Sequence, residues 1–406
     1  MRRRLVALVA AVALAPLVLS GCGENKAAAQ PAPSASASGA PVTESVTTGS
    51  LHLSLTPVTG RTNVPISAEI GIRVGGAEVT AVTLRDRDGK AVAGELRADG
   101  SAWVPSRPLK TRETYVASVV ATAPDGRTKT ATTRFTTMGR PARTTGTGLY
   151  LFDGHTYGVA MPVVVEFSPG IKKADRAAVQ RRMFVRTDPP QPGIWSWTAS
   201  GTQAYYRGPE FWRPGTEITV RIAVGGLPTG AGRYGDRDRS ATAKIGRSFV
   251  MKVENKTKTM TVEENGDVVR TMPVSLGKKS TPSSSGTMVV MEKLQQTVFD
   301  TTAELGPVEG YRMEIRYAQR LTWSGQYIHS APWSVGAQGR RNVSHGCVNV
   351  SPANARWLFA RTLVGDPITV RGTGDKLEYG NGWTAWDLSW PEFVKGSALP
   401  VPASLR

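Results

Sequence analysis

Short runs in which apolar and polar residues alternate dominate the chain between residues 51 and 138. Ile66–Val74 and Thr128–Thr136 are two such runs, and the turn dipeptides Asp88-Gly89 and Asp125-Gly126 separate runs rich in valine and threonine. No segment here has the 3.6-residue period of a long helix. Residues 50–138 are therefore expected to form an immunoglobulin-like sandwich that lacks the disulfide of antibody domains.

Residues 139–249 predict a second immunoglobulin-like unit, one that is richer in aromatic residues. Its aromatic residues are Trp195, Trp197, Tyr205, Tyr206, Phe211 and Trp212. Such a cluster can bind sugar, but we favour a core or a packing surface between domains. Gly225–Arg239, rich in glycine, arginine and aspartate, is expected to be a mobile loop.

Residues 250–372 predict a third, mostly β domain with one helix. Asn265-Gly266 between two alternating runs indicates a hairpin with a primed turn. Leu294–Arg320 has few strand signals and is expected to be a long loop or lid. Ser351-Pro352 begins a helix, which Gly365-Asp366-Pro367 ends, and Ile368–Arg371 is the last strand expected.

Cysteine and histidine are rare in this chain, and half of them lie in the later part of its third domain. The two cysteines are Cys22 and Cys347, and two of the four histidines, His329 and His345, lie within eighteen residues of Cys347. A thiol beside a base is the minimum set for covalent acyl transfer. Gly346 allows a sharp turn at the thiol, and nearby main-chain N–H groups can stabilise an oxyanion. The alternative is a small buried cysteine with a core histidine.

His329, fourteen intervening residues and then Ser344-His345-Gly346-Cys347-x-Asn349 resemble the signature of the L,D-transpeptidase catalytic domain. The run from Tyr327 to Ala355 is similar to the class of that family with two immunoglobulin-like domains. The resemblance implies a mainly β fold: two immunoglobulin-like sandwiches, a catalytic β domain with one short helix, and a tryptophan-rich C-terminal subdomain over residues 373–406 that packs on the catalytic domain.

The resemblance also implies roles for individual residues. Cys347 is expected to be the nucleophile, His329 the general base, and the main-chain carbonyl of Ser330 the group that orients the imidazole. His345, Gly346 and Cys347 are expected to supply main-chain donors to the oxyanion. The residues expected to organise or line the substrate site are Tyr311, Trp333, Ser344 and Asn349.

The reaction implied by the resemblance joins two peptidoglycan stem peptides. A tetrapeptide donor acylates the thiol and loses D-alanine, and the side-chain amine of a neighbouring stem's diamino acid then forms a 3→3 cross-link. Water as the acceptor makes the enzyme a carboxypeptidase. No cofactor or metal is expected, because two neighbouring histidines do not make a zinc site. The alternatives are a sortase-like cysteine transpeptidase and a non-catalytic wall-binding lipoprotein.

The N-terminus has the pattern of an exported lipoprotein. Three arginines precede the apolar run Leu5–Leu19, which predicts a signal peptide over residues 1–21. Leu19-Ser20-Gly21-Cys22 resembles a lipobox, so Cys22 is expected to carry the lipid that anchors the protein to the cell membrane, facing the cell wall. Residues 22–49, rich in alanine, proline and serine, predict a flexible tether.

The charge balance favours an anionic partner. The net charge is +18, or +15 without the three signal arginines. For an exported protein, anionic wall polymers or lipid head groups suit this charge better than nucleic acid, and solubility alone explains it equally well.

Overall fold

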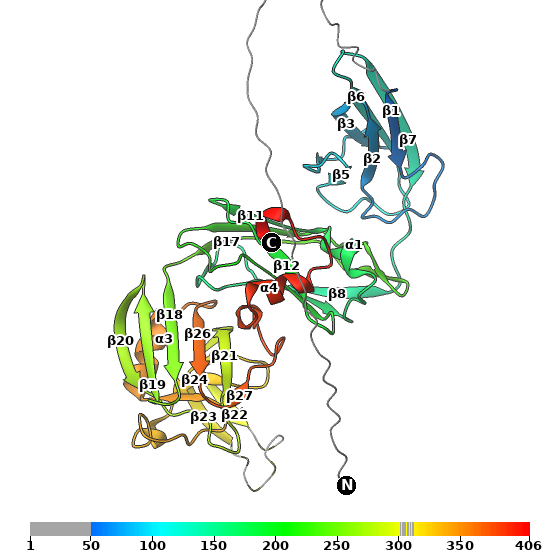
Figure 1. Ribbon diagram of the computed structural model, residues 1–406. Helices are drawn as coiled ribbons and strands as arrows, with labels where there is room; N and C mark the ends of the chain where they lie inside the picture. Colours follow the sequence, from blue (N-terminus) through cyan, green and yellow to red (C-terminus); the bar gives the residue numbers. More distant parts are fainter. Residues whose placement is uncertain (1–49, 301, 303–305, 307, 309, 311) are drawn as a thin grey trace, which may run out of the picture. The chain divides into compact units, whose positions relative to one another are not determined.

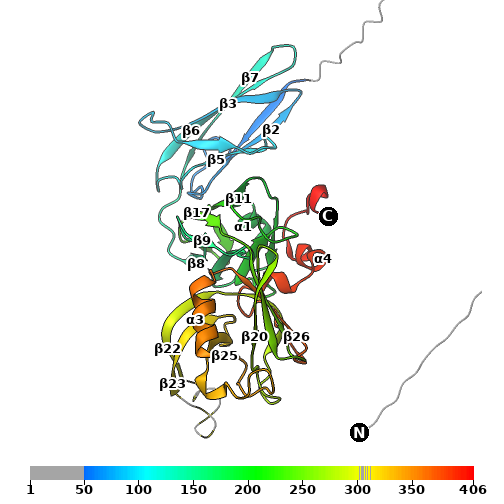
Figure 2. The same ribbon diagram turned by 90° about the vertical axis from the view of Figure 1, so that its left-hand side faces the viewer.

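The computed structural model describes residues 50–300, 302, 306, 308, 310 and 312–406 (Figure 1, Figure 2). The expected signal peptide, the tether with Cys22, and Tyr311 lie outside the described residues. In the described part of the chain, mainly β-structure is found, with a few short helices. No helix there is both long and apolar enough to span a membrane.

The first immunoglobulin-like unit consists of two packed sheets, β1-β2-β5-β4 and β3-β6-β7. Its strands are β1 (His52–Thr56), β2 (Ile70–Gly75), β3 (Glu78–Asp86), β4 (Gly94–Leu96), β5 (Ala102–Pro105), β6 (Thr114–Thr122) and β7 (Thr128–Thr136). β6 alternates between buried and half-buried positions along its whole length, as a strand with one face on the core does. The strand expected over Ile66–Val74 begins only at Ile70.

The second unit also has two sheets, β12-β13-β10-β8-β16-β15 and β11-β14-β17-β9. Its elements are β8 (Thr144–Leu149), β9 (Thr156–Tyr157), β10 (Val163–Ser168), α1 (Arg176–Gln180), β11 (Met183–Asp188), β12 (Ile194–Trp197), β13 (Gln203–Arg207), β14 (Glu217–Ile222), β15 (Pro228–Gly230), β16 (Arg233–Gly235) and β17 (Arg239–Ile245). Trp195, Trp197 and Trp212 are buried in its core, as the packing interpretation predicts.

The expectation of a mobile loop over Gly225–Arg239 is wrong. β15 and β16 lie within it, and β16 pairs in parallel with β8. The carboxylate of Asp238 explains the order, because it accepts the Gly225 N–H at 2.8 Å and pairs with Arg221 at 3.6 Å.

The third unit has a six-stranded sheet, β20-β19-β18-β26-β21-β27, and a four-stranded sheet, β22-β23-β24-β25. Its strands are β18 (Phe249–Glu254), β19 (Thr259–Glu264), β20 (Asp267–Pro273), β21 (Ser284–Val289), β22 (Glu292–Asp300), β23 (Arg312–Arg320), β24 (Tyr327–Ser330), β25 (Val348–Val350), β26 (Pro367–Arg371) and β27 (Asp375–Lys376). The hairpin turn between β19 and β20 has φ of +53° at Asn265 and +97° at Gly266, which confirms a primed turn.

The loop expected over Leu294–Arg320 is mostly a hairpin instead. β22 and β23, nine residues each, pair antiparallel from Glu292 opposite Arg320 to Asp300 opposite Arg312. Polar residues occupy most of the exposed positions of both strands and hide the apolar–polar alternation typical of a strand. Ile315 and Ala318 of β23 are nevertheless buried.

The helix α3 (Pro352–Arg361) begins where the sequence predicts and packs on β23 and β24 (Figure 2). The Ser351 side chain accepts the Asn354 N–H as the N-cap, and Pro352 is the first helical residue. Ala355 and Leu358 anchor the helix in the core of the third unit.

The C-terminal segment contains η2 (Ala385–Asp387), α4 (Trp390–Phe393), η3 (Val394–Gly396) and η4 (Ala403–Leu405), which are short helical turns. The expectation that it packs on the catalytic domain is wrong for most of its aromatic residues. Trp383 and Phe393 join the core of the second immunoglobulin-like unit, and the Trp386 indole donates to the Ala160 carbonyl at 2.6 Å. Leu377 alone of its buried residues belongs to the core of the third unit.

Candidate active site

Parallel pairing of β24 with β25 brings the histidine and the cysteine of the motif together. Ile328 pairs with Val348 and His329 with Asn349, so Cys347, just before β25, lies opposite Tyr327. Side chains two residues apart on a strand share a face. His329 and Cys347 therefore lie on the same face of the sheet.

His329 is buried, with a side chain held in one orientation. Its Nδ1 lies 2.9 Å from the Ser330 main-chain oxygen, so Nδ1–H donates and Nε2 is left as the acceptor. Burial lowers the imidazole pKa to about 4, against the opposing effect of the Ser330 carbonyl. The ring is consequently neutral near pH 7 and able to take a proton.

Cys347 is a free, partly exposed thiol. Its Sγ lies 3.7 Å from the Gly325 carbonyl oxygen, to which the thiol donates. Desolvation by the surrounding protein raises the pKa of the thiol to about 12, and a main-chain hydrogen bond with Tyr327 opposes that rise. The resting pair is therefore a neutral thiol and a neutral imidazole.

The loop that carries the thiol is held by two serine hydroxyls. The Ser344 hydroxyl donates to the Cys347 carbonyl at 2.7 Å and accepts the Gly346 N–H at 3.2 Å, while the Ser283 hydroxyl donates to the Gly346 carbonyl at 2.7 Å. Gly346 has φ of +125°, a conformation that other residues rarely adopt. Since the Gly346 N–H is engaged inside the loop, the Cys347 N–H is the candidate oxyanion donor nearest the thiol.

Asn349 links the cysteine strand to its neighbours. Its main chain exchanges two hydrogen bonds with Ser275, and its side-chain amide donates to the Ser334 hydroxyl at 3.2 Å. The Asn349 Oδ1 is buried and has no hydrogen-bond partner among the described residues. His345, by contrast, is half-buried on the loop.

Comparison with known proteins agrees with this geometry. Residues 61–228 match the family model of a bacterial Ig domain, and residues 248–370 match that of the L,D-transpeptidase catalytic domain. L,D-transpeptidase 2 of Mycobacterium tuberculosis is 34% identical in sequence to this chain. The match covers 84% of this chain and 83% of the relative. The chain belongs to the L,D-transpeptidase family. It is thus an acyltransferase that uses a cysteine nucleophile.

Two further relatives carry the same family name. L,D-transpeptidase 5 of Mycobacterium tuberculosis is 34% identical over 87% of this chain and 78% of its own length. The solved structure of the L,D-transpeptidase LdtMt1 in complex with imipenem is 37% identical, covers 57% of this chain and 100% of its own, and superposes with a TM-score of 0.48.

Aromatic side chains surround His329 in this L,D-transpeptidase. Trp333, whose side chain is 53% exposed, has its ring 6.0 Å from the His329 ring. The Phe299 ring stands edge-on to His329 at 5.5 Å and lies 4.6 Å from the Tyr327 ring. Trp333 thus lies beside His329, and its expected role at the substrate site stays a prediction, while Tyr311 is outside the described residues.

Sequence reasoning missed Phe299, Tyr327 and Gly325 at this site. The signal for Tyr327 was present, because it lies two residues before His329 on a strand and so shares its face. Phe299 was missed because its segment was interpreted as a loop. Gly325 has no motif, and only the folded chain shows that its carbonyl faces the thiol.

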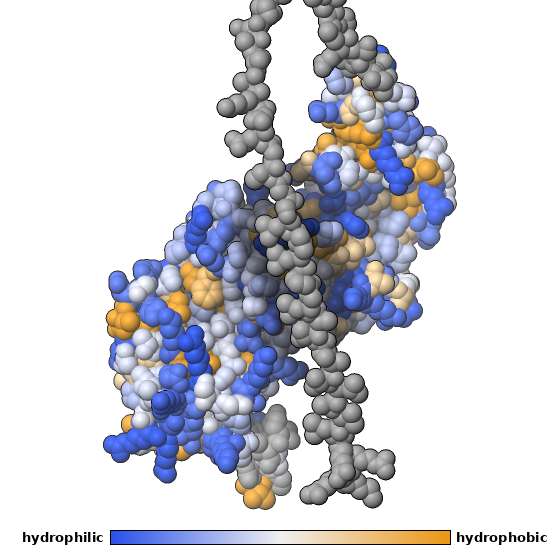
Figure 3. Space-filling model, viewed as in Figure 1, coloured by the Kyte–Doolittle hydropathy of each residue, from blue (hydrophilic) through white to orange (hydrophobic). Residues whose placement is uncertain are grey.

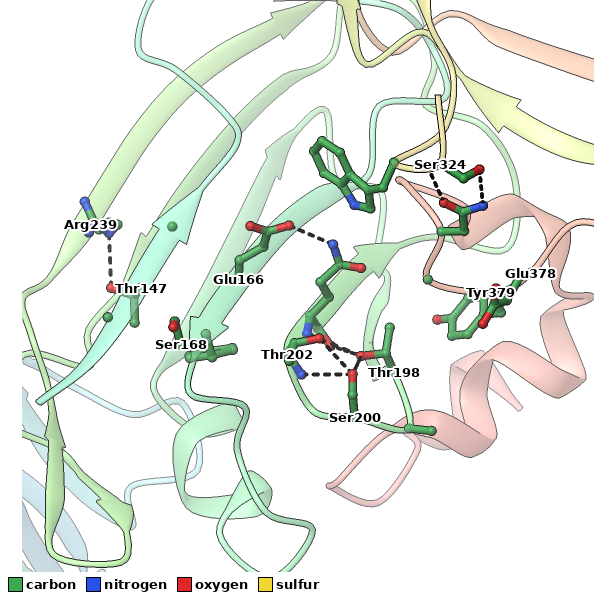
Figure 4. A pocket seen from close by; sticks show the side chains of 18 of the residues that line it. Thr147, Glu166, Ser168, Thr198, Ser200, Thr202, Arg239, Ser324, Glu378 and Tyr379 are labelled. Atoms are coloured by element: carbon green, nitrogen blue, oxygen red, sulfur yellow. Dashed lines mark hydrogen bonds between the residues drawn. The ribbon is translucent and has the colours of Figure 1, made fainter. Parts of the chain in front are cut away.

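A large cavity is lined in part by Trp323 and Ser324, the two residues that precede Gly325 (Figure 4). Its volume is about 910 Å³, and its lining includes Glu166, Gln203, Arg239, Trp323 and Tyr379. Glu166 accepts from the Gln203 amide at 2.7 Å on its wall. An apolar cavity of about 690 Å³ shares Trp323 and is lined by Phe152, Met291 and Trp383.

Hydrophilic residues cover much of the surface of the third unit on the face shown in Figure 3.

Among the residues that the structure describes, no three His, Cys, Asp or Glu side chains are grouped as ligands of a metal ion would be.

Proposed function

We propose that this L,D-transpeptidase forms 3→3 cross-links between peptidoglycan stem peptides through a thioester on Cys347. The observation that carries the proposal is the position of His329 beside the cysteine strand, with Nδ1–H donated to Ser330. This hydrogen bond leaves Nε2 free of its proton and fixes the ring plane, as the third member of a catalytic triad does.

In the first step, His329 Nε2 takes the Cys347 proton as the sulfur attacks the carbonyl of the third stem residue. A bond forms between sulfur and carbon, and the imidazolium returns the proton to the leaving D-alanine amine. Because the thiol pKa is about 12 in the resting enzyme, proton transfer and attack are expected to be coupled. The Cys347 N–H is positioned to stabilise the oxyanion.

In the second step, the side-chain amine of an acceptor stem attacks the thioester. The new C–N bond forms, the C–S bond breaks, His329 accepts the amine proton, and the sulfur leaves as thiolate and is reprotonated. With water in place of the amine, the same steps give carboxypeptidase activity.

The experiment is incubation of the purified protein with tetrapeptide-containing muropeptides, followed by tandem mass spectrometry of the dimers. Dimers linked between the third residues of both stems support the proposal, whereas links to the fourth residue or no dimers overturn it.

Imipenem provides a second test, since it should leave a covalent adduct on Cys347 in the wild type and none in Cys347→Ala. The family match favours this activity over a sortase or a non-catalytic binder.

We also propose that the mature protein is exported and held at the cell membrane by a lipid on Cys22. The Leu-Ser-Gly-Cys run after an apolar segment supports this, as does the tether that follows. Stable anchoring requires more than one acyl chain. Cys22→Ser should release the protein into the soluble fraction at high salt, and its retention on the membrane would contradict the proposal.

We propose, in addition, that the protein adsorbs to anionic wall polymers. The +15 charge of the chain without its three signal arginines supports adsorption to such polymers (18 − 3 = 15). More protein should co-sediment with anionic wall material than with neutralised wall material, and the amount bound to the anionic material should fall as salt is added. Equal binding to both materials would contradict this adsorption.

A further inference from the structure

A buried serine hydroxyl, that of Ser283, lies behind the loop that carries the thiol. Ser283 directly precedes β21 and is 1% exposed. Its oxygen accepts the Gly277 N–H at 3.0 Å, and its hydrogen is donated to the Gly346 carbonyl at 2.7 Å. Because a main-chain N–H can only donate, the Ser283 hydrogen has to point at the Gly346 carbonyl. The hydroxyl is therefore fixed in one direction.

The carbonyl that Ser283 binds belongs to the same peptide bond as the Cys347 N–H. The cis peptide bonds of the described residues all precede proline, so this bond is trans. In a planar trans peptide the N–H points opposite to the C=O. A hydrogen bond that fixes the Gly346 carbonyl therefore also fixes the direction of the Cys347 N–H, the candidate oxyanion donor.

The peptide bond between Gly346 and Cys347 needs such support. Gly346 has φ of +125°, where the absence of a Cβ leaves the backbone free to turn. A Cβ built on Gly346 would meet no atom closer than 3.6 Å beyond its chain neighbours, so packing restrains the glycine little. The Ser344 hydroxyl binds the Gly346 N–H and the Cys347 carbonyl, which belong to the peptide bonds on either side. Ser283 thus holds the peptide bond that Ser344 does not.

The segment that carries Ser283 is itself held at both ends. At its start, a side chain on Gly277 would overlap the Thr281 carbonyl, so the chain turns there as closely as glycine allows. The Lys278 N–H then donates to the Ser344 carbonyl at 2.8 Å. At its end, the Ser284 N–H donates to the Gln326 Oε1 at 3.1 Å. Ser283 is therefore presented to the thiol loop on a fixed support.

We infer that Ser283 positions the Cys347 N–H for the oxyanion and strengthens it as a donor. Ser283 is a positioning residue, because it touches the peptide bond and not the substrate. The Gly277 N–H, the Ser283 hydroxyl and the Gly346–Cys347 peptide form a chain of hydrogen bonds that ends at the oxyanion. Groups in such a chain polarise one another, so each donor becomes stronger.

The inference rests on the proposed thioester on Cys347. As the sulfur bonds to the acyl carbon, the C=O electron pair moves to the carbonyl oxygen and makes it an oxyanion. The pair returns when the bond to the leaving nitrogen breaks, and that nitrogen takes the proton from the His329 imidazolium. A reaction of Cys347 that forms no oxyanion should consequently be indifferent to Ser283.

The variant Ser283→Ala tests the inference in two reactions of the same thiol. Acylation by imipenem passes through an oxyanion, whereas alkylation by iodoacetamide displaces iodide from a saturated carbon and forms none. The variant should be acylated about tenfold more slowly, a smaller loss than the roughly 10²-fold or more that removal of an oxyanion donor itself causes. The loss should lie in the maximal rate of acylation and not in the imipenem concentration that gives half of it. The alkylation rate should equal that of the wild type.

Ser283→Thr keeps the hydroxyl and should recover most of the acylation rate. Ser285→Ala is the matched control, because the Ser285 hydroxyl accepts the Thr373 N–H at 3.0 Å and does not bind the thiol loop. An equal loss of Ser283→Ala in both reactions would show a displaced thiol, and no loss in either would show a dispensable hydroxyl, so both results overturn the inference. Acylation of the wild type by imipenem without any 3→3 dimers would defeat the proposed function and leave this inference standing.

Discussion

The Arg207 guanidinium lies 4.2 Å from the centroid of the Phe393 ring, beneath the C-terminal segment. The Trp386 ring lies 4.4 Å from the same guanidinium, which also donates to the carbonyls of Ala385 and Leu388 at 3.0 and 2.8 Å. Desolvation lowers the pKa of Arg207 to about 10. A cation of the second immunoglobulin-like unit is thus bound by rings and carbonyls in place of a carboxylate.

Arg207→Met is expected to destabilise the protein by about 3 kcal/mol. Methionine keeps the apolar stem but leaves the Ala385 and Leu388 carbonyls without their donor in a buried place. Thermal unfolding and limited proteolysis of the C-terminal segment measure the effect, with the exposed Arg213→Met as the control. Unchanged stability would mean that desolvation of the guanidinium costs as much as its contacts contribute.

His329→Ala is expected to lose cross-linking by a factor on the order of 10² to 10⁴, as removal of a general base does. His345→Ala should retain far more activity, because only its main chain is assigned a role. Both variants should keep the wild-type unfolding temperature within a few degrees if the loss is chemical. If His345→Ala proves the weaker enzyme, the base has been assigned to the wrong histidine.

Much of the fold could be predicted wherever a local signal was strong. The β19–β20 turn follows from Asn265-Gly266, because both residues tolerate the positive φ of a primed turn. The start of α3 follows from Ser351-Pro352 for similarly local reasons. His329 and Cys347 could be predicted as the reacting pair because the chain has only two cysteines and four histidines.

What could not be predicted depends on contacts distant in sequence. β22 and β23 were missed because polar residues on both strands hide the period-2 pattern, and Phe299 was lost with them. The packing of Trp386 on the second unit could not be predicted, since nothing in a tryptophan indicates which surface it will cover. The lipid on Cys22 stays a prediction.

The alkylation of Cys347 by iodoacetamide should report its protonation state. With a pKa near 12, the thiolate fraction rises about tenfold per pH unit through the neutral and mildly alkaline range. The logarithm of the rate should therefore increase linearly with no plateau below about pH 10. A plateau at neutral pH would reveal a thiolate–imidazolium pair and contradict the neutral resting state, and Cys347→Ala gives the background rate.

Asp366 should make the stability of the protein fall as the pH rises from about 4 to 7. Its carboxyl is fully buried at the C-terminal side of α3, and burial raises its pKa from the ordinary 3.8 to about 7, against opposing effects of the Leu363 N–H, Arg247 and Lys293. Between these two values the folded state binds more protons than the unfolded state, so the free energy of unfolding decreases with pH, by at most about 4 kcal/mol.

The variant Asp366→Asn tests this pH dependence because its side chain cannot ionise. In the wild type the carboxylate accepts the Leu363 N–H at 2.7 Å, and the amide oxygen of asparagine can accept the same hydrogen bond. Urea unfolding across this pH range should show a falling stability for the wild type and a flatter profile for the variant, which should be the more stable of the two above pH 7. Asp267→Asn, on the exposed end of β20, is the control and should follow the wild type. Parallel profiles for Asp366→Asn and the wild type would show that the carboxylate is ionised at little cost, with Arg247, 3.7 Å away, as the compensating charge.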